Sequence, residues 1–426
     1  MPASHRSRRG EVRRCFAVPL APRRAVCGAV RARAGQDLTV WSGDTAIMQS
    51  IRGGRQPMQA RAAVMPERHG RWTLETVEVA EPGPQEVLVR VVASGICQTD
   101  VHARDGFFPM PCPAVYGHEG AGVVEQVGSA VTTLKPGDHV IMANPSCGAC
   151  PECCAGFETY CSNASRLKQS GYRADGTSLS FRRGQDPIYG SFFQQSSFAS
   201  LTLATARNTV RVPDDVPLDI LAAFPCGVNT GAGAVMHVLK PQPGDSYVAF
   251  GMGTVGFAGL LAAKLAGCAP LIAVDVFDER LALARSLGAT HTVNATDPQL
   301  VDAVRRLAGG RGAQWCLEAA GVPAALRAAV EVLAPRGTAC LVGSAGAGVE
   351  VSLEMRTLQQ GRSVRGCIQG ESDVQTFLPR LIALYRDGKL PIERLVRHYP
   401  HAAINDAVAD MVAGKTIKAV LQMRIP

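Results

Sequence analysis

A glycine-rich turn most strongly limits what this chain can fold into. It reads Gly251-Met-Gly253-Thr-Val-Gly256 and stands between an apolar run typical of a buried strand and a stretch typical of a helix. Gly251 permits a tight turn, Gly253 lets the backbone approach a pyrophosphate, and Gly256 allows the helix to pack closely on the strand. The N-terminus of that helix would face the negative phosphates. The pattern therefore predicts the first βαβ unit of a dinucleotide-binding domain.

The residue that ends the next expected strand is acidic. Asp275 stands 19 residues after Gly256, where a carboxylate accepts hydrogen bonds from ribose hydroxyls and repels a 2′-phosphate. NAD is therefore favoured over NADP as the cofactor. Two alternatives stay open, because Asp275 could instead cap the following loop and Arg280 is close enough in sequence to relax a strict preference.

Strand and helix patterns alternate around this turn, which indicates an α/β fold with a parallel, doubly wound Rossmann sheet. The expected strands are 246–251, 271–275, 314–318 and 338–343, and the expected helices are 254–266, 278–287 and 323–333. Upstream, a β-rich domain shaped as a distorted barrel is predicted by short alternating runs at 60–65, 72–79, 86–94, 120–127 and 138–143. The rest reads as an irregular stretch over 144–200, a helix over 374–386 and a strand over 419–423.

The net positive charge of the chain comes entirely from its first 57 residues. Residues 1–57 hold 11 of the 44 basic residues and 3 of the 36 acidic ones, which accounts for the whole formal charge of +8. Residues 58–426 are therefore neutral, which argues against a nucleic-acid or membrane partner. No apolar run reaches the ~18 residues that a transmembrane helix needs.

We expect the basic leader at residues 1–57 to be disordered, or to precede a true translation start near Met58. Its Arg-rich, acid-poor composition leaves an organellar targeting peptide and a binding arm as alternatives. Secretion is disfavoured, because no apolar core precedes a small-residue cleavage site. The cysteines cluster as metal ligands do in a reducing compartment, so we expect a cytoplasmic protein.

Four cysteines in one short segment predict a structural zinc site. The spacing Cys-x2-Cys-x2-Cys-x7-Cys is formed by Cys147, Cys150, Cys153 and Cys161. Four thiolates can close a tetrahedral shell and leave no position for a substrate. An iron–sulfur cluster is the competing interpretation, but ferredoxin runs of this kind continue with x3-Cys-Pro, which does not follow here. Cys154 adjoins a ligand and is expected to point away from the metal.

Three further ligand-type residues predict a second, open zinc site. They are Cys97, His118 and Cys226. Zinc that performs chemistry takes three protein ligands and keeps a fourth position for water or substrate. Glu119 directly follows His118 and is expected to tune the metal and its ligands from behind. Any one of these residues alone could belong to an ordinary core, so their convergence is the hypothesis.

Two polar residues follow Cys97 at positions suited to proton transfer. Thr99 places a hydroxyl where it could hydrogen-bond an alcohol substrate. His102 is the candidate to pass a proton to solvent, with a solvated surface histidine as the alternative. Phe107 and Phe108 could line an apolar substrate pocket or belong to the core. A metal beside a dinucleotide predicts hydride transfer to or from an oxygen-bearing carbon.

Together these motifs resemble the zinc-containing medium-chain alcohol dehydrogenase family, from about Met58 to the C-terminus. The resemblance implies a GroES-like catalytic domain and a Rossmann domain, with the active site in the cleft between them. It suggests a catalytic domain over 58–226, an NAD-binding domain over 227–368 and a return to the catalytic domain over 369–426. It also implies two zinc ions per subunit, NAD, a small alcohol or aldehyde substrate, and a homo-oligomer that is a dimer or tetramer.

Within that family, two stretches resemble the aryl-alcohol (benzyl-alcohol) dehydrogenases, namely 190–199 and 366–385. We therefore expect reversible oxidation of a primary, aromatic alcohol to its aldehyde, with aliphatic or other alcohols as the alternative. Residues 369–372 read Gln-Gly-Glu-Ser where those relatives usually read Glu-Gly-Asp-Ser, which weakens the assignment of one alcohol. A zinc-free enone or quinone reductase and a zinc-ribbon nucleic-acid-binding protein are more distant alternatives.

Overall fold

The computed structural model of the protein describes residues 58–423. The leader predicted at residues 1–57 and the last three residues lie outside the described residues. Within the described part of the chain, no helix combines the length and apolar content needed to cross a membrane.

The C-terminal half contains a six-stranded parallel sheet in the order β13-β12-β11-β14-β15-β16. Its strands are β11 (Tyr247–Phe250), β12 (Leu271–Asp275), β13 (His291–Asn294), β14 (Ala313–Glu318), β15 (Leu333–Leu341) and β16 (Ser363–Gly366). The chain starts at β11, winds outward to β13, and then crosses back to wind outward the other way from β14. Sheets of this kind bind ligands where the winding direction reverses. The predicted Rossmann fold is confirmed.

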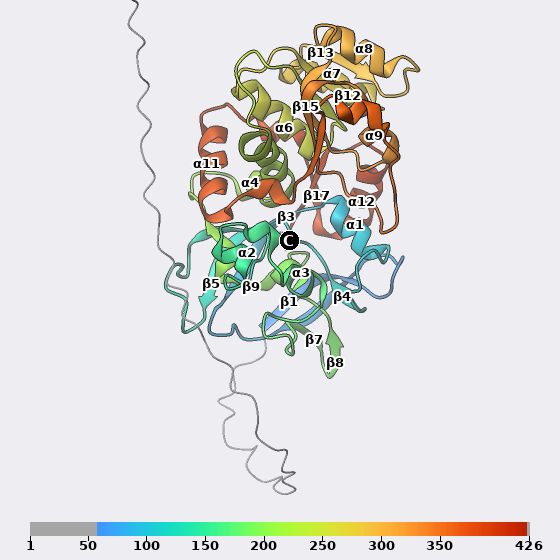
Figure 1. Ribbon diagram of the computed structural model, residues 1–426. Coiled ribbons are helices and arrows are strands. Elements are labelled where there is room, and N and C mark those ends of the chain that lie inside the picture. The colour runs from blue at the N-terminus through green and yellow to red at the C-terminus, as the bar shows by residue number, and fades with distance from the viewer. Residues whose placement is uncertain (1–57, 424–426) are drawn as a thin grey trace, which may run out of the picture. The chain divides into compact units, whose positions relative to one another are not determined.

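Successive residues of these strands face two different cores. Tyr247 and Ala249 of β11 pack in the core that includes α6 and α7, whereas Val248 and Phe250 pack in the core that includes α8 and α9. The four helices are α6 (Thr254–Leu265), α7 (Asp278–Leu287), α8 (Leu300–Leu307) and α9 (Pro323–Glu331). Figure 1 shows α6 and α9 on opposite sides of the sheet. Since both faces are covered, all four residues of the central strand β11 are buried.

The N-terminal half folds into two sheets around a core of its own. One sheet has the order β4 (Ala114–Val115), β1 (Met58–Met65), β2 (Thr73–Val79), β7 (Phe181–Arg183) and β8 (Asp186–Ile188). The other runs β10 (Thr209–Arg211), β6 (His139–Met142), β5 (Gly120–Val127), β3 (Glu86–Gly95), β18 (Lys418–Gln422) and β17 (Val396–Pro400), with β9 (Leu201–Thr205) also paired to β3. This is the β-rich part expected from the short alternating runs.

Short helices connect these sheets. They are α1 (Gln98–Arg104), α2 (Pro151–Cys154), η1 (Glu158–Tyr160), α3 (Ala164–Gln169), η2 (Phe192–Gln194), η3 (Ala206–Asn208), α4 (Leu218–Leu221), α10 (Met355–Gln359), η6 (Gln369–Glu371), η7 (Ile392–Leu395) and η8 (His401–Ala403). Of these, α1, α2 and η1 lie in the segments that carry candidate site residues.

The last described strand returns to the N-terminal half. β18 pairs antiparallel with β3, and β17 pairs in parallel with β18. Figure 1 shows β17 and α12 (Ile404–Val412), both red, in the same region as β3, and α12 packs against β18 and β17. In contrast, α11 (Val374–Arg386) packs against the helical residues 224–239. The domain boundaries suggested by the sequence stay a prediction.

Residues 224–239 form a continuous helical run that the sequence did not suggest. The run consists of η4 (Phe224–Val228), α5 (Asn229–Gly233) and η5 (Ala234–Leu239), with helical backbone angles at each junction. Its glycines lower helix propensity, but they let it approach α6 closely. A Cβ on Gly231 would lie 2.0 Å from the carbonyl oxygen of Val255, at the start of α6. The missing side chain therefore places Cys226 next to the dinucleotide turn.

Three expectations about the elements need correction. The helix expected over 323–333 ends at Glu331, and the strand expected over 338–343 starts at Leu333, because β15 is interrupted by a register shift around Arg336 (φ 67°). The stretch expected to be irregular, 144–200, contains the short strands β7 and β8. The elements β13, α8 and β16 were not predicted, since β13 and β16 have four residues each and all four of β16 are exposed.

The buried His401 predicts a loss of stability in mild acid. Its Nε2 lies 3.2 Å from the carbonyl oxygen of Phe198, and burial lowers its pKa to about 4. Because this pKa is below that of an unfolded histidine, the stabilising contribution is present above about pH 6.5 and is lost as the pH falls toward 4. We expect His401 to contribute about 2 kcal/mol of extra destabilisation between pH 7 and pH 5.

Urea unfolding of the wild type and His401→Gln at both pH values tests this expectation. Glutamine keeps a donor toward Phe198 but does not titrate, so its loss of stability should be smaller. The exposed His69→Gln should behave as the wild type (its side chain is 71% exposed). An equal loss in all three proteins would contradict the assignment to His401.

Candidate active site

The residues predicted for the open zinc site meet in the structure from three segments of the chain. Ligand atoms all lie within 4.8 Å of one another in the group formed by Cys97, His118, Glu119 and Cys226. The sulfur atoms of Cys97 and Cys226 are 3.9 Å apart. Cys97 precedes α1, His118 and Glu119 precede β5, and Cys226 lies in the helical run. The fold therefore brings together residues as far as 129 positions apart.

The donor set of this group fits zinc. Nε2 of His118 is buried and has no hydrogen-bond partner within residues 58–423, which indicates that another group satisfies it. Two thiols and an imidazole are preferred zinc ligands. The hydrogen bond between the two thiols holds the pKa of Cys97 well below its usual range and raises the pKa of Cys226. One of the pair is therefore ready to act as the thiolate that binds a metal.

Asp100 orients the histidine of this group. Its Oδ1 lies 3.0 Å from Nδ1 of His118 and accepts the backbone N–H of Gly117, while its Oδ2 accepts the backbone N–H of Cys97 at 2.9 Å. A buried carboxylate on Nδ1 fixes the tautomer and leaves Nε2 for the metal. This orienting role of Asp100 was not predicted from the sequence. The available signal was the capping-box spacing from Cys97 to Asp100 at the start of α1.

Glu119 was expected behind the ligands, and the structure pairs it with a lysine from the far end of the chain. Its Oε2 lies 2.6 Å from Nζ of Lys418, which also donates to the carbonyl oxygen of Ile96 at 3.1 Å. Both charged side chains are buried. Lys418 begins β18 and is 299 residues from Glu119. No local pattern marks such a lysine, so the sequence could not single it out.

Thr99 and His102 both lie near the cluster. The hydroxyl oxygen of Thr99 is 3.6 Å from the sulfur of Cys97. The ring of His102 stacks on Phe107, with 4.5 Å between ring centroids, and burial lowers its pKa. The two phenylalanines differ, because Phe107 is 51% exposed whereas Phe108 packs against the core of the N-terminal half.

An aromatic side chain that was not assigned forms a wall beside the cluster. The ring of Phe193 stacks on His118, with 4.6 Å between centroids, and the ammonium of Lys168 lies 5.4 Å from the centre of the same ring. Phe193 has a left-handed backbone (φ 52°), as do Gln194 and Ser196. Non-glycine residues adopt this conformation at a cost, and such residues gather at functional sites.

The dinucleotide turn opens into the same cavity as the metal cluster. A cavity of about 780 Å³ is lined by Cys97, His102, Gly251, Gly253 and Asp275, among others. Gly251 has a left-handed backbone (φ 87°), and a Cβ on Gly253 would meet no atom within 4 Å, so a phosphate can approach. One cavity therefore connects both predicted sites.

Asp275 is held by the backbone at the end of β12. Its Oδ2 accepts the N–H of Met252 at 2.5 Å, and its Oδ1 accepts the N–H of Phe277 at 2.9 Å. It therefore caps the following loop as well as lining the cavity. Arg280 stacks over Phe277, and its Nη1 lies 3.8 Å from the Asp275 carboxylate. A guanidinium at this position could also accommodate a 2′-phosphate.

The four cysteines predicted for the closed site also meet. Ligand atoms all lie within 4.8 Å of one another in the group formed by Cys147, Cys150, Cys153 and Cys161. The backbone N–H of Cys147 points to the sulfur of Cys161 at 3.3 Å. Cys154 is exposed and does not belong to this group. The four sulfurs fit a zinc shell with no open position.

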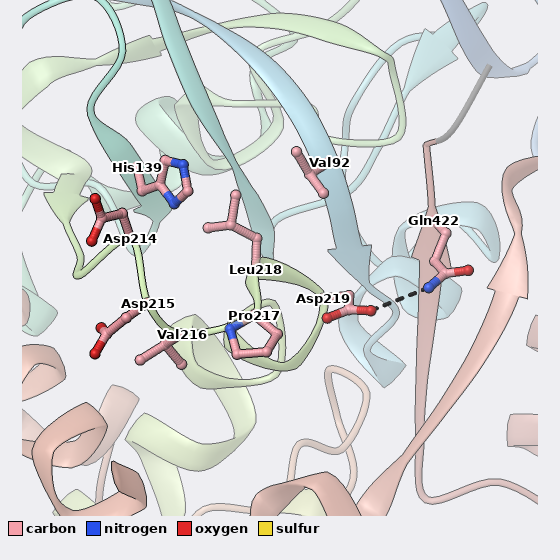
Figure 2. A pocket seen from close by; sticks show the side chains of 9 residues that line it. All are labelled: Val92, His139, Asp214, Asp215, Val216, Pro217, Leu218, Asp219 and Gln422. Carbon is pink, nitrogen blue, oxygen red and sulfur yellow. Dashed lines mark hydrogen bonds between the residues drawn. The ribbon is translucent and has the colours of Figure 1, made fainter.

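A smaller cavity lies elsewhere on the protein. Figure 2 shows this cavity of about 360 Å³, which is lined by His139 and three aspartates, with Gln422 hydrogen-bonded to Asp219 at 3.2 Å. None of the predicted site residues lines it. We therefore place the active site in the larger cavity.

Two parts of the chain match family descriptions. Residues 83–214 match the alcohol dehydrogenase GroES-like domain, and residues 254–383 match the zinc-binding dehydrogenase domain. Geraniol dehydrogenase from Castellaniella defragrans is 38% identical over 368 residues, which cover 85% of this chain and 98% of that protein.

Solved structures agree with these matches over nearly the same range. A zinc-binding-domain alcohol dehydrogenase protein from Burkholderia ambifaria superposes with a TM-score of 0.84 and 42% identity, over 87% of this chain and 100% of its own. Benzyl alcohol dehydrogenase from Acinetobacter calcoaceticus superposes with a TM-score of 0.83 and 37% identity, over 86% of this chain and 100% of its own. The similarity thus includes both sheets of the N-terminal half and the Rossmann sheet.

Breaking the closed group should cost stability rather than chemistry. Cys150→Ser removes one of four ligands, so we expect the loss of one zinc per subunit and a fall of more than about 3 kcal/mol in the free energy of unfolding. Metal analysis and chemical denaturation measure both quantities. Cys154→Ser, in the same loop but outside the group, is the matched control. Full zinc content in Cys150→Ser would refute this role.

Removing Lys418 should leave the buried carboxylate of Glu119 without its ion-pair partner. We expect Lys418→Met to lower the free energy of unfolding by about 3–5 kcal/mol, because Glu119 loses the cation that compensates its burial. Lys415→Met removes an exposed lysine three residues earlier and should change stability little (its side chain is 69% exposed). Denaturant titration of the two variants separates the effects, and equal stabilities would show that the buried pair contributes nothing.

Proposed function

Because the chain belongs to the zinc-containing medium-chain alcohol dehydrogenase family, whose members use zinc and a nicotinamide dinucleotide, we propose that it oxidises a primary, aromatic alcohol to its aldehyde with NAD. The observation that carries the proposal is the single cavity shared by Cys97 of the metal cluster and the Gly251–Gly256 turn. A hydride donor and its acceptor have to meet within contact distance. The same reaction runs in reverse for an aldehyde.

Each bound group has residues of this chain to hold it. Cys97, His118 and Cys226 would bind the catalytic zinc, and Gly251 and Gly253 would face the cofactor phosphates. When bound, zinc supplies a Lewis acid that polarises the substrate oxygen, and the nicotinamide supplies the hydride acceptor. The four-cysteine group would hold the structural zinc and takes no part in the chemistry.

The proton of the alcohol leaves through side chains of α1. Thr99 would accept the hydroxyl proton at its Oγ1, which lies beside the sulfur of Cys97. His102, whose pKa is lowered by burial, is neutral near pH 7 and can accept a proton at a ring nitrogen. It is half-buried in the wall of the cavity, so it can exchange that proton with solvent. The pair forms a route from the cluster to water.

An aromatic substrate is supported by the wall of the site. The ring of Phe193 stacks on His118 and places an aromatic side chain beside the metal cluster. One similar structure is a benzyl alcohol dehydrogenase, whereas one similar protein is a geraniol dehydrogenase. The second candidate substrate is therefore a non-aromatic alcohol such as geraniol. Both relatives are dehydrogenases, which favours this function over nucleic-acid binding.

NAD is proposed over NADP because Asp275 lines the cavity and would repel a 2′-phosphate. The neighbouring Arg280 is the feature that favours the second candidate, NADP. We also propose a homo-oligomer, either a dimer or a tetramer. In its support, every residue of the edge strand β16 is exposed, including the apolar Val364. Met355, at the start of the preceding helix α10, is a second exposed apolar side chain.

Turnover of benzyl alcohol, geraniol and an unbranched primary alcohol, each with NAD or NADP, tests the proposal by absorbance of the reduced cofactor. We expect the highest kcat/KM for benzyl alcohol with NAD. Cys97→Ala should lose one zinc per subunit and fall to background turnover. Cys112→Ala, which lies outside both metal groups, should keep its full zinc content and its turnover. Full turnover by Cys97→Ala would overturn the proposed mechanism, and turnover of geraniol alone would change the substrate class.

A further inference from the structure

Gln369 reaches one of the metal-binding cysteines. It begins the turn η6, in the stretch where the sequence departs from the aryl-alcohol relatives. Its Nε2 lies 3.6 Å from the sulfur of Cys226, although the two residues are 143 positions apart. The side chain is half-buried.

The neighbouring hydrogen bonds define which end of the Gln369 amide faces the sulfur. Nδ2 of Asn229 lies 2.9 Å from the backbone carbonyl oxygen of Gln369, which can only accept. The same nitrogen lies 3.3 Å from Oε1 of Gln369, so this oxygen is turned toward Asn229. The remaining nitrogen, Nε2, must then donate to Cys226. Ser372 agrees, since its Oγ is 2.9 Å from Oδ1 of Asn229.

The turn that carries Gln369 is clamped against the helical run. Three consecutive residues have left-handed backbones, Gln369, Gly370 and Glu371. A Cβ on Gly233 would lie 2.5 Å from the carbonyl oxygen of Gly370, so the two backbones touch only because this helix position is glycine. Nδ1 of His237 lies 3.0 Å from the same oxygen. The cost of the left-handed residues is thus offset by contacts that aim the turn at the site.

The far side of the turn is anchored as well. Glu371 accepts a hydrogen bond from the hydroxyl of Tyr160 at 2.9 Å and pairs with Arg365 at 2.8 Å. Tyr160 belongs to the segment between the last two cysteines of the closed group. The position of Gln369 is therefore fixed from both halves of the protein.

We propose that Gln369 is a positioning residue that tunes the catalytic metal through an N–H···S hydrogen bond to Cys226. A hydrogen bond to a thiolate draws charge away from the sulfur, so the sulfur donates less to a bound metal. Held by Cys97, His118 and Cys226, a metal would then supply a stronger Lewis acid to the substrate oxygen. This role rests on the proposed function, in which Cys226 is a zinc ligand of an alcohol dehydrogenase.

Two substitutions separate the hydrogen bond from the shape of the side chain. Gln369→Met has a similar length but no donor, and Gln369→Glu has the same shape with a negative charge in place of the N–H. Gln375→Met is the matched control, because it removes the same amide six residues later, where Nε2 donates to the backbone carbonyl oxygens of Arg207 and Thr209 rather than to a sulfur. Circular dichroism checks that each variant is folded.

The main readout is the thiolate-to-metal charge-transfer band of the cobalt-substituted enzyme. Gln369 does not touch the four-cysteine group, so a spectral difference between variants reports on the open site. We expect Gln369→Met to shift the band to lower energy and to lower kcat for benzyl alcohol by about 10-fold with little change in KM. Gln369→Glu should in addition speed the loss of metal to a chelator. Gln375→Met should leave the band unchanged.

An unchanged band and unchanged metal loss in both Gln369 variants would overturn the proposal. An equal band shift in Gln375→Met would overturn it too, since loss of the hydrogen bond to Cys226 would then not be the cause. If the wild type oxidised none of the alcohols, the proposed function would fail. The cobalt spectra would still decide the role of Gln369, because they need no substrate.

Discussion

The buried ion pair of Glu119 and Lys418 is the interaction on which the metal site depends. Removing two charges from water costs several kcal/mol each, and only a close, hydrogen-bonded partner offsets that cost. The 2.6 Å contact is possible because β18 pairs with β3, the strand that leads directly to Cys97. The ligand at 97, the histidine at 118 and the C-terminal strand are thus held in one arrangement.

The second constraint is the close approach of two helices that would normally stay further apart. Helix axes pack about 8–10 Å apart when ordinary side chains separate them. Gly231 removes that separation and brings the helical run onto the start of α6. Cys226 and the dinucleotide turn belong to these two elements. The separation of Cys226 from the dinucleotide turn is therefore fixed by the absence of a side chain.

Local patterns predicted much of this protein, and long-range pairings could not be predicted. Patterns of about 15 residues or fewer, in which spacing and periodicity are informative, predict three features. These are the Gly251–Gly256 turn, the four-cysteine segment and α11. Lys418 and Gln369 act on residues 299 and 143 positions away, and nothing near them in sequence differs from an ordinary strand or turn. The helical run at 224–239 was missed because its glycines have low helix propensity, although they allow the run to pack closely on α6.

The two metal groups differ in how much of the chain each requires. All four sulfurs of the closed group lie between residues 147 and 161, so that segment can bind its metal while the ribosome is still adding later residues. The open group needs Cys226 and the charge of Lys418, which stands 257 positions after Cys161. It is therefore complete only once β18 has paired with β3, whereas the closed group depends on its own segment alone.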